Sequence, residues 1–271
     1  MAMTKLGPLL LLLLVPVTAA RAEPSPQAIA EAAVRLGCTS VAFTYNDPVV
    51  FLEYAVDTAL ACRAQGIRTG GVTAGYIEPG PRAELFGAMD AINIDLKGFT
   101  EEYYHKVCGG HLDRVLETIE WAVHESPAWI ELTTLVVPGH NDSDAELTRM
   151  ARWVIDHVGP DVPMHFSAFH PDWKMLDVSA TPPQTLARAR RIAMDAGVHF
   201  AYTGNVHDPD GDTTFCPSCQ TPVIERDWYE ILRYDLDPQG ACPTCGTVIP
   251  GVFEVAAGTW GRRRLPVTLR G

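Results

Sequence analysis

Short apolar segments alternate with segments of helical character over residues 25–207, and this alternation constrains the fold most strongly. A helix between two strands carries the chain back to the end of the sheet from which it started, so the strands run parallel. We expect six strands, at residues 40–44, 67–73, 91–95, 129–137, 164–169 and 198–202. The sequence therefore predicts an α/β fold built on a parallel sheet.

Helix signals occupy the stretches between these strands. Ser25 followed by Pro26 is a typical start of a helix, and Gly37 is a typical end. Ser143 and Glu146 have the spacing of a capping box, in which each side chain bonds the backbone N–H of the other residue. We expect helices at residues 26–36, 48–66, 81–86, 111–123, 143–158 and 181–196.

The composition limits the classes of function. Lysine and arginine number 21 and aspartate and glutamate number 33, which gives a formal net charge of −12. A chain this acidic is not expected to bind the phosphate backbone of nucleic acid. Hydrophobic residues make up 47% of the chain, which is enough for a sizeable core. These values favour a soluble enzyme or a protein-binding domain.

Residues 1–24 have the pattern of a leader. Lys5, an apolar run at residues 9–14 and the sequence Ala20-Arg21-Ala22 are typical of a secretory signal. The run is too short to span a bilayer, and no other segment is apolar over a sufficient length, so we expect no membrane span. The alternative is a wrongly assigned start codon with upstream coding sequence lost, which makes the leader spurious. The first interpretation predicts export, and the second predicts a cytoplasmic protein.

Polar side chains gather where the expected strands end. Ligand sites in barrels and open α/β sheets lie at this carboxyl edge, so we expect a site there. Asp95 and Lys97 place a carboxylate and an ammonium at one strand end, which suits a zwitterionic or polyhydroxyl ligand. The alternative for Asn46 and Asp47 is a helix cap before Pro48. The candidates are Tyr45, Asn46, Asp47, Thr73, Asp95, Lys97, His165 and His170.

Two C-x-x-C pairs define a separate module at residues 208–255, followed by a tail at 256–271. Cys216 and Cys219 form the first pair, and Cys242 and Cys245 form the second. Four thiolates held on tight turns suit tetrahedral zinc in a structural site. Iron in a rubredoxin-like site is the chemical alternative, and two disulfides are the alternative if the chain is exported.

The ordered motifs resemble one known family. They are TYNDP at 44–48, TAGY at 73–76, DLKGF at 95–99, VPGHND at 137–142, HFSAFHP at 165–171 and TGN at 203–205, followed by CPSC and CPTC. This set resembles the radical SAM enzymes of the AmmeMemoRadiSam system, relatives of the pyruvate formate-lyase activating enzymes. The resemblance implies a partial (β/α)6 barrel that binds S-adenosylmethionine (SAM).

The resemblance also implies roles for the candidate residues. Tyr45-Asn46-Asp47 stands where relatives have a Gly-Gly-Glu-Pro-type turn that holds the methionyl amino group. Asp47 keeps the carboxylate but shortens it by one methylene. Thr73, Asp95 and Lys97 are expected to face the methionyl and ribose portions, with Lys97 as a partner for the carboxylate. His165 and His170 are expected to line the next strand end.

One family feature is missing. Radical SAM chemistry uses a [4Fe–4S] cluster held by a C-x-x-x-C-x-x-C loop after the first strand, and it cleaves SAM reductively to a 5′-deoxyadenosyl radical. Only Cys38 precedes Tyr45 in this chain. We therefore expect a barrel that lacks its first strand, a chain truncated or misassigned at its start, and no activity as written.

Three hypotheses compete for the function. The first is a radical SAM enzyme, which by family has an electron donor and acts on an unidentified protein or small molecule. The second is a non-catalytic scaffold that binds SAM and zinc. The third is a metal-dependent hydrolase that uses His165, His170 and Asp95, although no typical metal-binding spacing supports it.

Overall fold

The fold is described from a computed structural model, which describes residues 24–261 and 263–267. The expected leader at residues 1–24 lies outside the described residues except for its last position, and the expected tail is described only in part.

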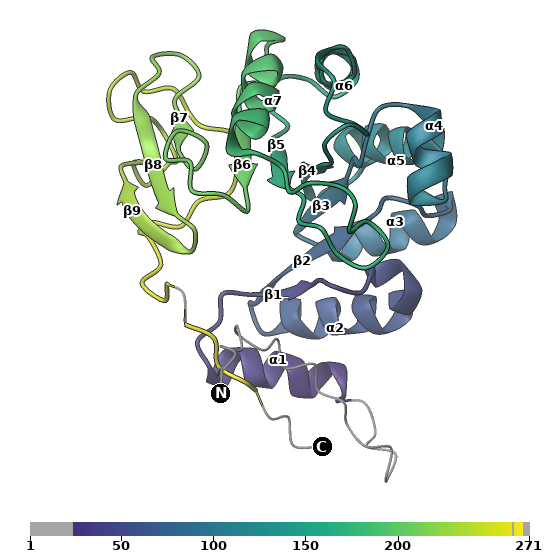
Figure 1. Cartoon of the computed structure of the whole chain (residues 1–271). Coiled ribbons are helices and arrows are strands. Elements are labelled where there is room, and N and C mark those ends of the chain that lie inside the picture. Colours follow the sequence, from purple (N-terminus) through teal and green to yellow (C-terminus); the bar gives the residue numbers. More distant parts are fainter. Residues whose placement is uncertain (1–23, 262, 268–271) are drawn as a thin grey trace, which may run out of the picture.

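Six parallel strands form one curved sheet in which they follow chain order (Figure 1). This confirms the predicted α/β fold. The strands are β1 (Ser40–Phe43), β2 (Arg68–Thr73), β3 (Ala91–Asp95), β4 (Trp129–Val136), β5 (Met164–Ala168) and β6 (Ala201–Gly204). Among the described residues β1 pairs only with β2, so β1 is an edge strand of the sheet.

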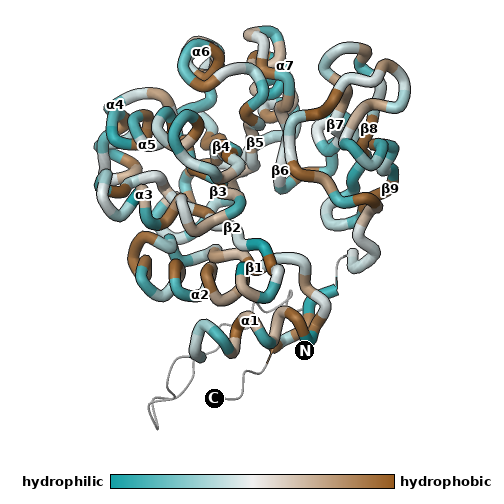
Figure 2. Tube along the Cα trace, turned by 180° about the vertical axis from the view of Figure 1, so that it is seen from behind, coloured by the Kyte–Doolittle hydropathy of each residue, from teal (hydrophilic) through white to brown (hydrophobic). Residues whose placement is uncertain are grey.

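Helices cover the convex side of this sheet (Figures 1 and 2). The α-helices are α1 (Pro26–Arg35), α2 (Leu52–Ala64), α3 (Pro79–Ala88), α4 (Glu101–Tyr103), α5 (Leu112–Glu125), α6 (Asp144–His157) and α7 (Pro183–Asp195). A 3-10 turn, η1 (Pro48–Phe51), precedes α2, and a π-helical turn, η2 (Tyr104–Cys108), follows α4. The sequence analysis did not predict α4 and η2, because this short segment has no extended helical pattern.

The two faces of the sheet differ in polarity. On β3, Ile92 and Ile94 are buried in the core against the helices, whereas Asn93 and Asp95 alternate with them and remain half-buried. The same alternation continues on β4 and β5. The core therefore fills the helical side, and the concave face is polar and open.

Two local expectations are wrong. The sixth strand begins at Ala201, because the apolar residues before it are used elsewhere: Val198 is buried in the main core, and Phe200 packs against the cysteine module. The capping box is only half formed. Ser143 accepts from the N–H of Glu146, but the Glu146 carboxylate turns away to accept from the N–H of Phe99 at 2.6 Å.

The cysteine module lies beside β6 (Figure 1). It contains a three-stranded antiparallel sheet of β7 (Thr214–Phe215), β8 (Pro222–Asp227) and β9 (Glu230–Tyr234). Its small core holds Cys216, Cys242 and their apolar neighbours, and Phe200 joins it from the main domain. The module is therefore packed directly on the barrel.

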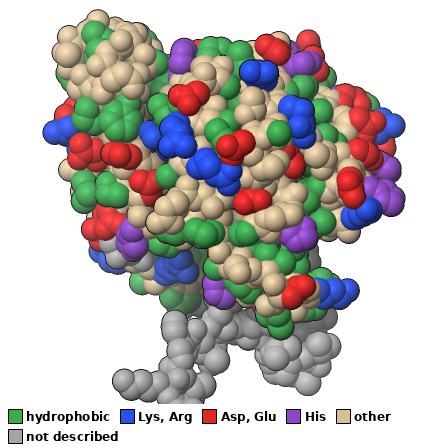
Figure 3. All heavy atoms as spheres, turned by 45° about the horizontal axis from the view of Figure 1, so that its top comes forward, with side chains coloured by type: hydrophobic (Ala, Val, Ile, Leu, Met, Phe, Trp, Pro, Cys, Tyr) green, Lys and Arg blue, Asp and Glu red, His purple; other side chains and the backbone are tan. Residues whose placement is uncertain are grey.

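In the part of the chain that the structure describes, every helix is too short or too polar to cross a membrane. Basic and acidic side chains are mixed over the face seen in Figure 3.

Candidate functional site

Asp95 and Lys97 form an ion pair at the carboxyl end of β3. Lys97 Nζ lies 2.7 Å from Asp95 Oδ2, and both side chains are half-buried. Asn93 donates to Asp95 Oδ1 at 3.4 Å and accepts from the Thr133 hydroxyl at 2.6 Å. These contacts hold a carboxylate and an ammonium together on the concave face.

The backbone after β3 is fixed by side chains from other elements. Thr134 donates to the carbonyl of Leu96, and the Tyr104 hydroxyl accepts from the N–H of Lys97 at 3.0 Å. Asn141, which is fully buried, donates to the Lys97 carbonyl at 2.6 Å. Since the Lys97 backbone is bonded on both sides, its ammonium is presented from a rigid support.

Gly98 in this segment has no room for a side chain. A Cβ at this position would lie 2.5 Å from the ring of Tyr103. The glycine of the DLKGF motif is therefore explained by packing.

Asp47 and Thr73 bond one another on the helical side of the same edge. Asp47 Oδ2 accepts from the Thr73 hydroxyl at 3.1 Å and from the N–H of Ala74 at 2.8 Å, while Oδ1 caps η1 through Val49. Thr73 pairs in register with Ile94 and is 2% exposed. The structure does not bring Thr73 to the concave face, and it supports the capping role that was the alternative for Asp47.

Three other candidates lie at the surface of this edge. Tyr45 is 98% exposed and has a left-handed backbone with φ 70°, and Asn46 and His170 are also exposed. The structure therefore leaves these three side chains outside the concave face proper.

His165 lies on the concave face at the level of Asp95. The register runs from Asp95 through Thr133 and His165 to Tyr202 across four neighbouring strands. His165 stacks on Tyr202, with ring centroids 5.1 Å apart. Three predicted residues, Asp95, Lys97 and His165, thus share this face.

The sequence analysis missed the partner of His165. Glu131 Oε2 lies 2.7 Å from His165 Nε2, and Trp129 donates to Glu131 Oε1 at 2.9 Å. The available signal was the alternation in 129–133, where Trp129, Glu131 and Thr133 alternate with the apolar Ile130 and Leu132.

The environment of Glu131 favours its ionised form. Burial raises the pKa of this carboxyl, but the hydrogen bond and charge of His165, the Trp129 hydrogen bond and the charge of Arg226 together bring it below its ordinary value. An ionised carboxylate only accepts hydrogen bonds, so His165 carries its proton on Nε2 toward Glu131.

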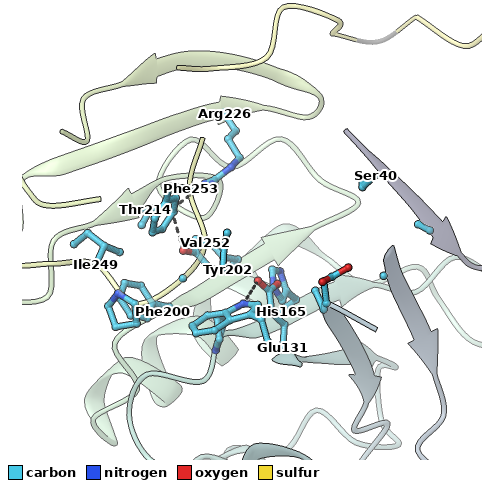
Figure 4. Close-up of a pocket in the computed structure, with 18 of the residues that line it drawn as sticks. Ser40, Glu131, His165, Phe200, Tyr202, Thr214, Arg226, Ile249, Val252 and Phe253 are labelled. Carbon is cyan, nitrogen blue, oxygen red and sulfur yellow. Dashed lines mark hydrogen bonds and ion pairs between the residues drawn. The ribbon is translucent and has the colours of Figure 1, made fainter. Parts of the chain in front are cut away.

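A cavity of about 540 Å³ lies between the concave face and the cysteine module (Figure 4). Its lining includes Glu131, His165 and Tyr202 from the sheet and Thr214 and Arg226 from the module. Asp47, Thr73, Asp95 and Lys97 do not line it. The concave face therefore has two parts, the charged carboxyl edge and this cavity, and His165 lies on the cavity wall.

The four module cysteines form a metal-binding site. Their sulfur atoms all lie within 4.8 Å of one another, with Cys216 and Cys245 3.5 Å apart and Cys219 and Cys242 3.7 Å apart. Tetrahedral zinc with Zn–S bonds of about 2.3 Å separates sulfur atoms by about 3.8 Å. The cage therefore fits a tetrahedral metal ion.

The two knuckles have the same local structure. Cys216 and Cys242 each donate a backbone N–H to a threonine carbonyl five residues later, at 2.9 and 2.8 Å. Gln220 and Gly246 occupy the same left-handed position in the two turns. The repeated pattern C-P-x-C-x-T, which ends at Thr221 and Thr247, was the sequence signal for this equivalence.

The other cysteines do not form a second site. Cys38 and Cys108 are exposed, and Cys62 is buried in α2. Within residues 24–261 and 263–267, only the four module cysteines form a metal-binding group of three or more such ligands.

Comparison with protein families identifies a match over the first part of the sheet domain. The model of the family described as "Radical SAM superfamily" matches residues 20–151. The uncharacterized protein MJ0808 of Methanocaldococcus jannaschii is 39% identical over 228 residues, which are 84% of this chain and 67% of that protein. Pyruvate formate-lyase 1-activating enzyme of Escherichia coli K12 is 24% identical over 165 residues, which are 56% of this chain. The aligned part is 66% of that enzyme.

Solved structures share the fold. A domain of pyruvate-formate lyase-activating enzyme from Bacteroides vulgatus has a TM-score of 0.54 at 16% identity, covering 61% of this chain and 98% of the domain. Streptococcus suis SuiB bound to S-adenosylmethionine has a TM-score of 0.54 at 13% identity, covering 70% of this chain and 43% of SuiB. At these identities the similarity establishes the fold alone.

We predict that Glu131→Gln reduces stability in a pH-dependent manner. Because the folded pKa of Glu131 is lowered, its ionisation stabilises the folded protein near neutral pH, and this contribution is lost as the pH falls below about 4.3. Urea unfolding should show E131Q to be less stable than wild type near neutral pH, with the difference shrinking in acid. Glu120→Gln, at an exposed position on α5, is the control. A difference that stays constant with pH contradicts this account.

Proposed function

Because this chain belongs to the radical SAM superfamily, we propose that the carboxyl edge of its concave sheet face binds S-adenosylmethionine. The observation that carries the proposal is the ion pair of Asp95 and Lys97, held at 2.7 Å on a backbone that Tyr104 and Asn141 fix. The methionyl part of SAM is a zwitterion. Lys97 suits its carboxylate, and Asp95 suits its ammonium or a ribose hydroxyl.

The remaining predicted residues surround this pair in the proposal. Asp47 and Thr73 act by fixing the β1 and β2 ends relative to one another, as their mutual hydrogen bond supports. Tyr45 and Asn46, exposed on the turn after β1, are proposed to contact the methionyl amino group, as the family resemblance implies. His165 and His170 are proposed to contact it from β5 and from the segment that follows β5.

The finer family assignment is also a proposal. The ordered motifs support membership of the AmmeMemoRadiSam group, and the similarity to pyruvate formate-lyase activating enzymes supports a relation to enzymes that act on proteins. We accordingly propose a protein or small-molecule substrate, an electron donor and a cytoplasmic location. The first two apply to the activity of the whole protein, since this chain spans about two thirds of its curated relatives.

The family cluster does not fit the residues of this sequence. In this family the [4Fe–4S] cluster is held by three thiolates at C-x-x-x-C-x-x-C spacing, and no three cysteines of this sequence have it. The module cysteines form a closed four-thiolate cage, which leaves no open metal position. We therefore propose that the chain as written does not cleave SAM; the second candidate function is a non-catalytic protein that binds SAM and zinc.

We further propose that the four-cysteine cage holds zinc in a structural role. The nearly equal contacts of the sulfur atoms and the matched knuckles support a closed tetrahedral site. When bound, zinc would cross-link the two knuckles and stabilise a module whose own core is small.

The SAM site is tested by calorimetric titration. We expect the 271-residue chain to bind SAM, and we expect Lys97→Ala and Asp95→Ala each to weaken the affinity about tenfold or more, through loss of a charge-assisted contact. Lys106→Ala removes an exposed lysine paired with Glu102 and should leave the affinity unchanged. Unchanged affinity in both site variants removes the proposed site.

The two candidate functions are separated by an assay of turnover. We expect the chain, after reconstitution with iron and sulfide and reduction with dithionite, to produce no 5′-deoxyadenosine from SAM, since it lacks the cysteine loop. A pyruvate formate-lyase activating enzyme is the positive control. Detection of 5′-deoxyadenosine above the protein-free background contradicts the scaffold function.

The metal is tested by elemental analysis of the purified protein. We expect about one zinc per chain, lost in Cys242→Ser together with a lower melting temperature, because a structural site stabilises the fold that holds it. Cys38→Ser, at an exposed cysteine outside the cage, should retain the zinc. Iron in place of zinc makes the metal assignment wrong, and two disulfides without metal contradict the site.

A further inference from the structure

The cavity between sheet and module lies away from the proposed SAM site. It is lined by Ser40, Arg68, Ala91 and Trp129, which are the first residues of β1 to β4, so it occupies the amino-terminal half of the concave face. The module covers it through β7, β8 and residues 249–253 (Figure 4). Its volume of about 540 Å³ is typical of a small-molecule site.

Aromatic rings form much of the cavity wall. Trp129, Phe200 and Tyr202 contribute from the sheet side, and Phe253 contributes from the module side. His165 stacks on Tyr202, and the Tyr202 hydroxyl lies 2.9 Å from Thr214 Oγ1. Flat, rigid walls of this kind favour a planar ring over a flexible chain.

One cation on the wall forms no ion pair with a described carboxylate, although its charge acts on Glu131 and Asp212. Arg226 donates to Thr214 Oγ1 at 2.9 Å and to the Asp212 carbonyl at 3.3 Å, and it forms no ion pair with any residue that the structure describes. Both of these bonds use Nη1, so Nε and Nη2 remain available as donors. Arg226 can therefore bind an anion with two further N–H groups.

Most other charged groups of the cavity already have partners. Arg68 pairs with Glu254 at 2.8 Å, Asp90 accepts from the N–H of Thr69 at 2.7 Å, and Glu131 is bonded to His165. Burial and the charges of Asp208 and Asp227 raise the pKa of Asp212, against the opposing charges of Arg226 and His207. An anionic group of a ligand is therefore expected to contact Arg226.

We propose that this cavity is a second ligand site, which binds a planar aromatic molecule with one anionic group placed on Arg226. His165 Nδ1, which has no partner among the described residues, offers a second polar contact on the opposite wall (Figure 4). The site shares only His165 with the proposed SAM site, so it is tested without SAM.

The test uses 1-naphthoate as the probe, titrated into the full chain without SAM and followed by calorimetry. We expect 1-naphthoate to bind at least tenfold more tightly than 1-naphthamide, which lacks the charge, and than cyclohexanecarboxylate, which lacks the planar ring. Arg226→Gln should lower the affinity for 1-naphthoate at least tenfold. Arg226→Lys keeps the positive charge but loses the planar guanidinium with its several N–H donors. This variant should bind 1-naphthoate with intermediate affinity.

The matched control is Arg233→Gln on the neighbouring strand β9. Arg233 is paired with Glu225 and Asp235 and does not line the cavity, so this variant should bind 1-naphthoate like the wild type. Thermal unfolding identifies any variant that fails to fold. In that case the comparison of 1-naphthoate with 1-naphthamide and cyclohexanecarboxylate on the wild-type protein still tests the proposal. The proposal is overturned if 1-naphthoate does not bind wild type, binds no better than its analogues, or binds a folded R226Q equally well. The SAM titration is independent, so failure here leaves the SAM site standing.

Discussion

The unequal polarity of the two sheet faces is the constraint on which the rest of this structure depends. A parallel sheet is usually buried on both faces and apolar throughout. Here Ile92, Ile94 and their counterparts on β4 and β5 bury one face under helices, while Asp95, Glu131 and His165 keep the other face polar. Such a face cannot be closed by apolar packing, so it stays open to solvent, to the module and to ligands.

Strand pairing does not position the charged pair at the carboxyl edge by itself. Lys97 lies beyond the end of β3, and side chains from Tyr104, Thr134 and Asn141 take over the backbone hydrogen bonds of this segment. The Glu146 carboxylate does the same for Phe99, at the expense of its own helix cap. The protein thus uses buried polar groups from several elements to hold one short segment rigid, which is what a binding residue on that segment requires.

The sequence made the alternation of strands and helices, the cysteine cage and the charged pair predictable, because each depends on local pattern. Asp95 ends β3 and Lys97 follows two residues later, so continuing the strand's period of two puts both side chains on one face. Thr73 also ends a strand, but its face depends on the register with Ile94, which pattern alone does not fix. Glu131 and His165 are 34 residues apart and meet only through the pairing of β4 with β5. The sequence near either residue therefore does not predict the other as its partner.

The module changes what the concave face can do. Without it, the amino-terminal half of the face would be an open polar surface, where a small ligand loses little contact with water. With Arg226 placed over the Tyr202 ring and Phe253 lining the same space, this surface becomes the floor of a cavity. Because β8 carries Arg226 and the cysteine cage holds the turn that precedes β8, an intact cage is a condition for the cavity as well as for the module. The proposed structural metal site and the proposed ligand site are therefore linked through β8, although no cysteine sulfur needs to touch a ligand.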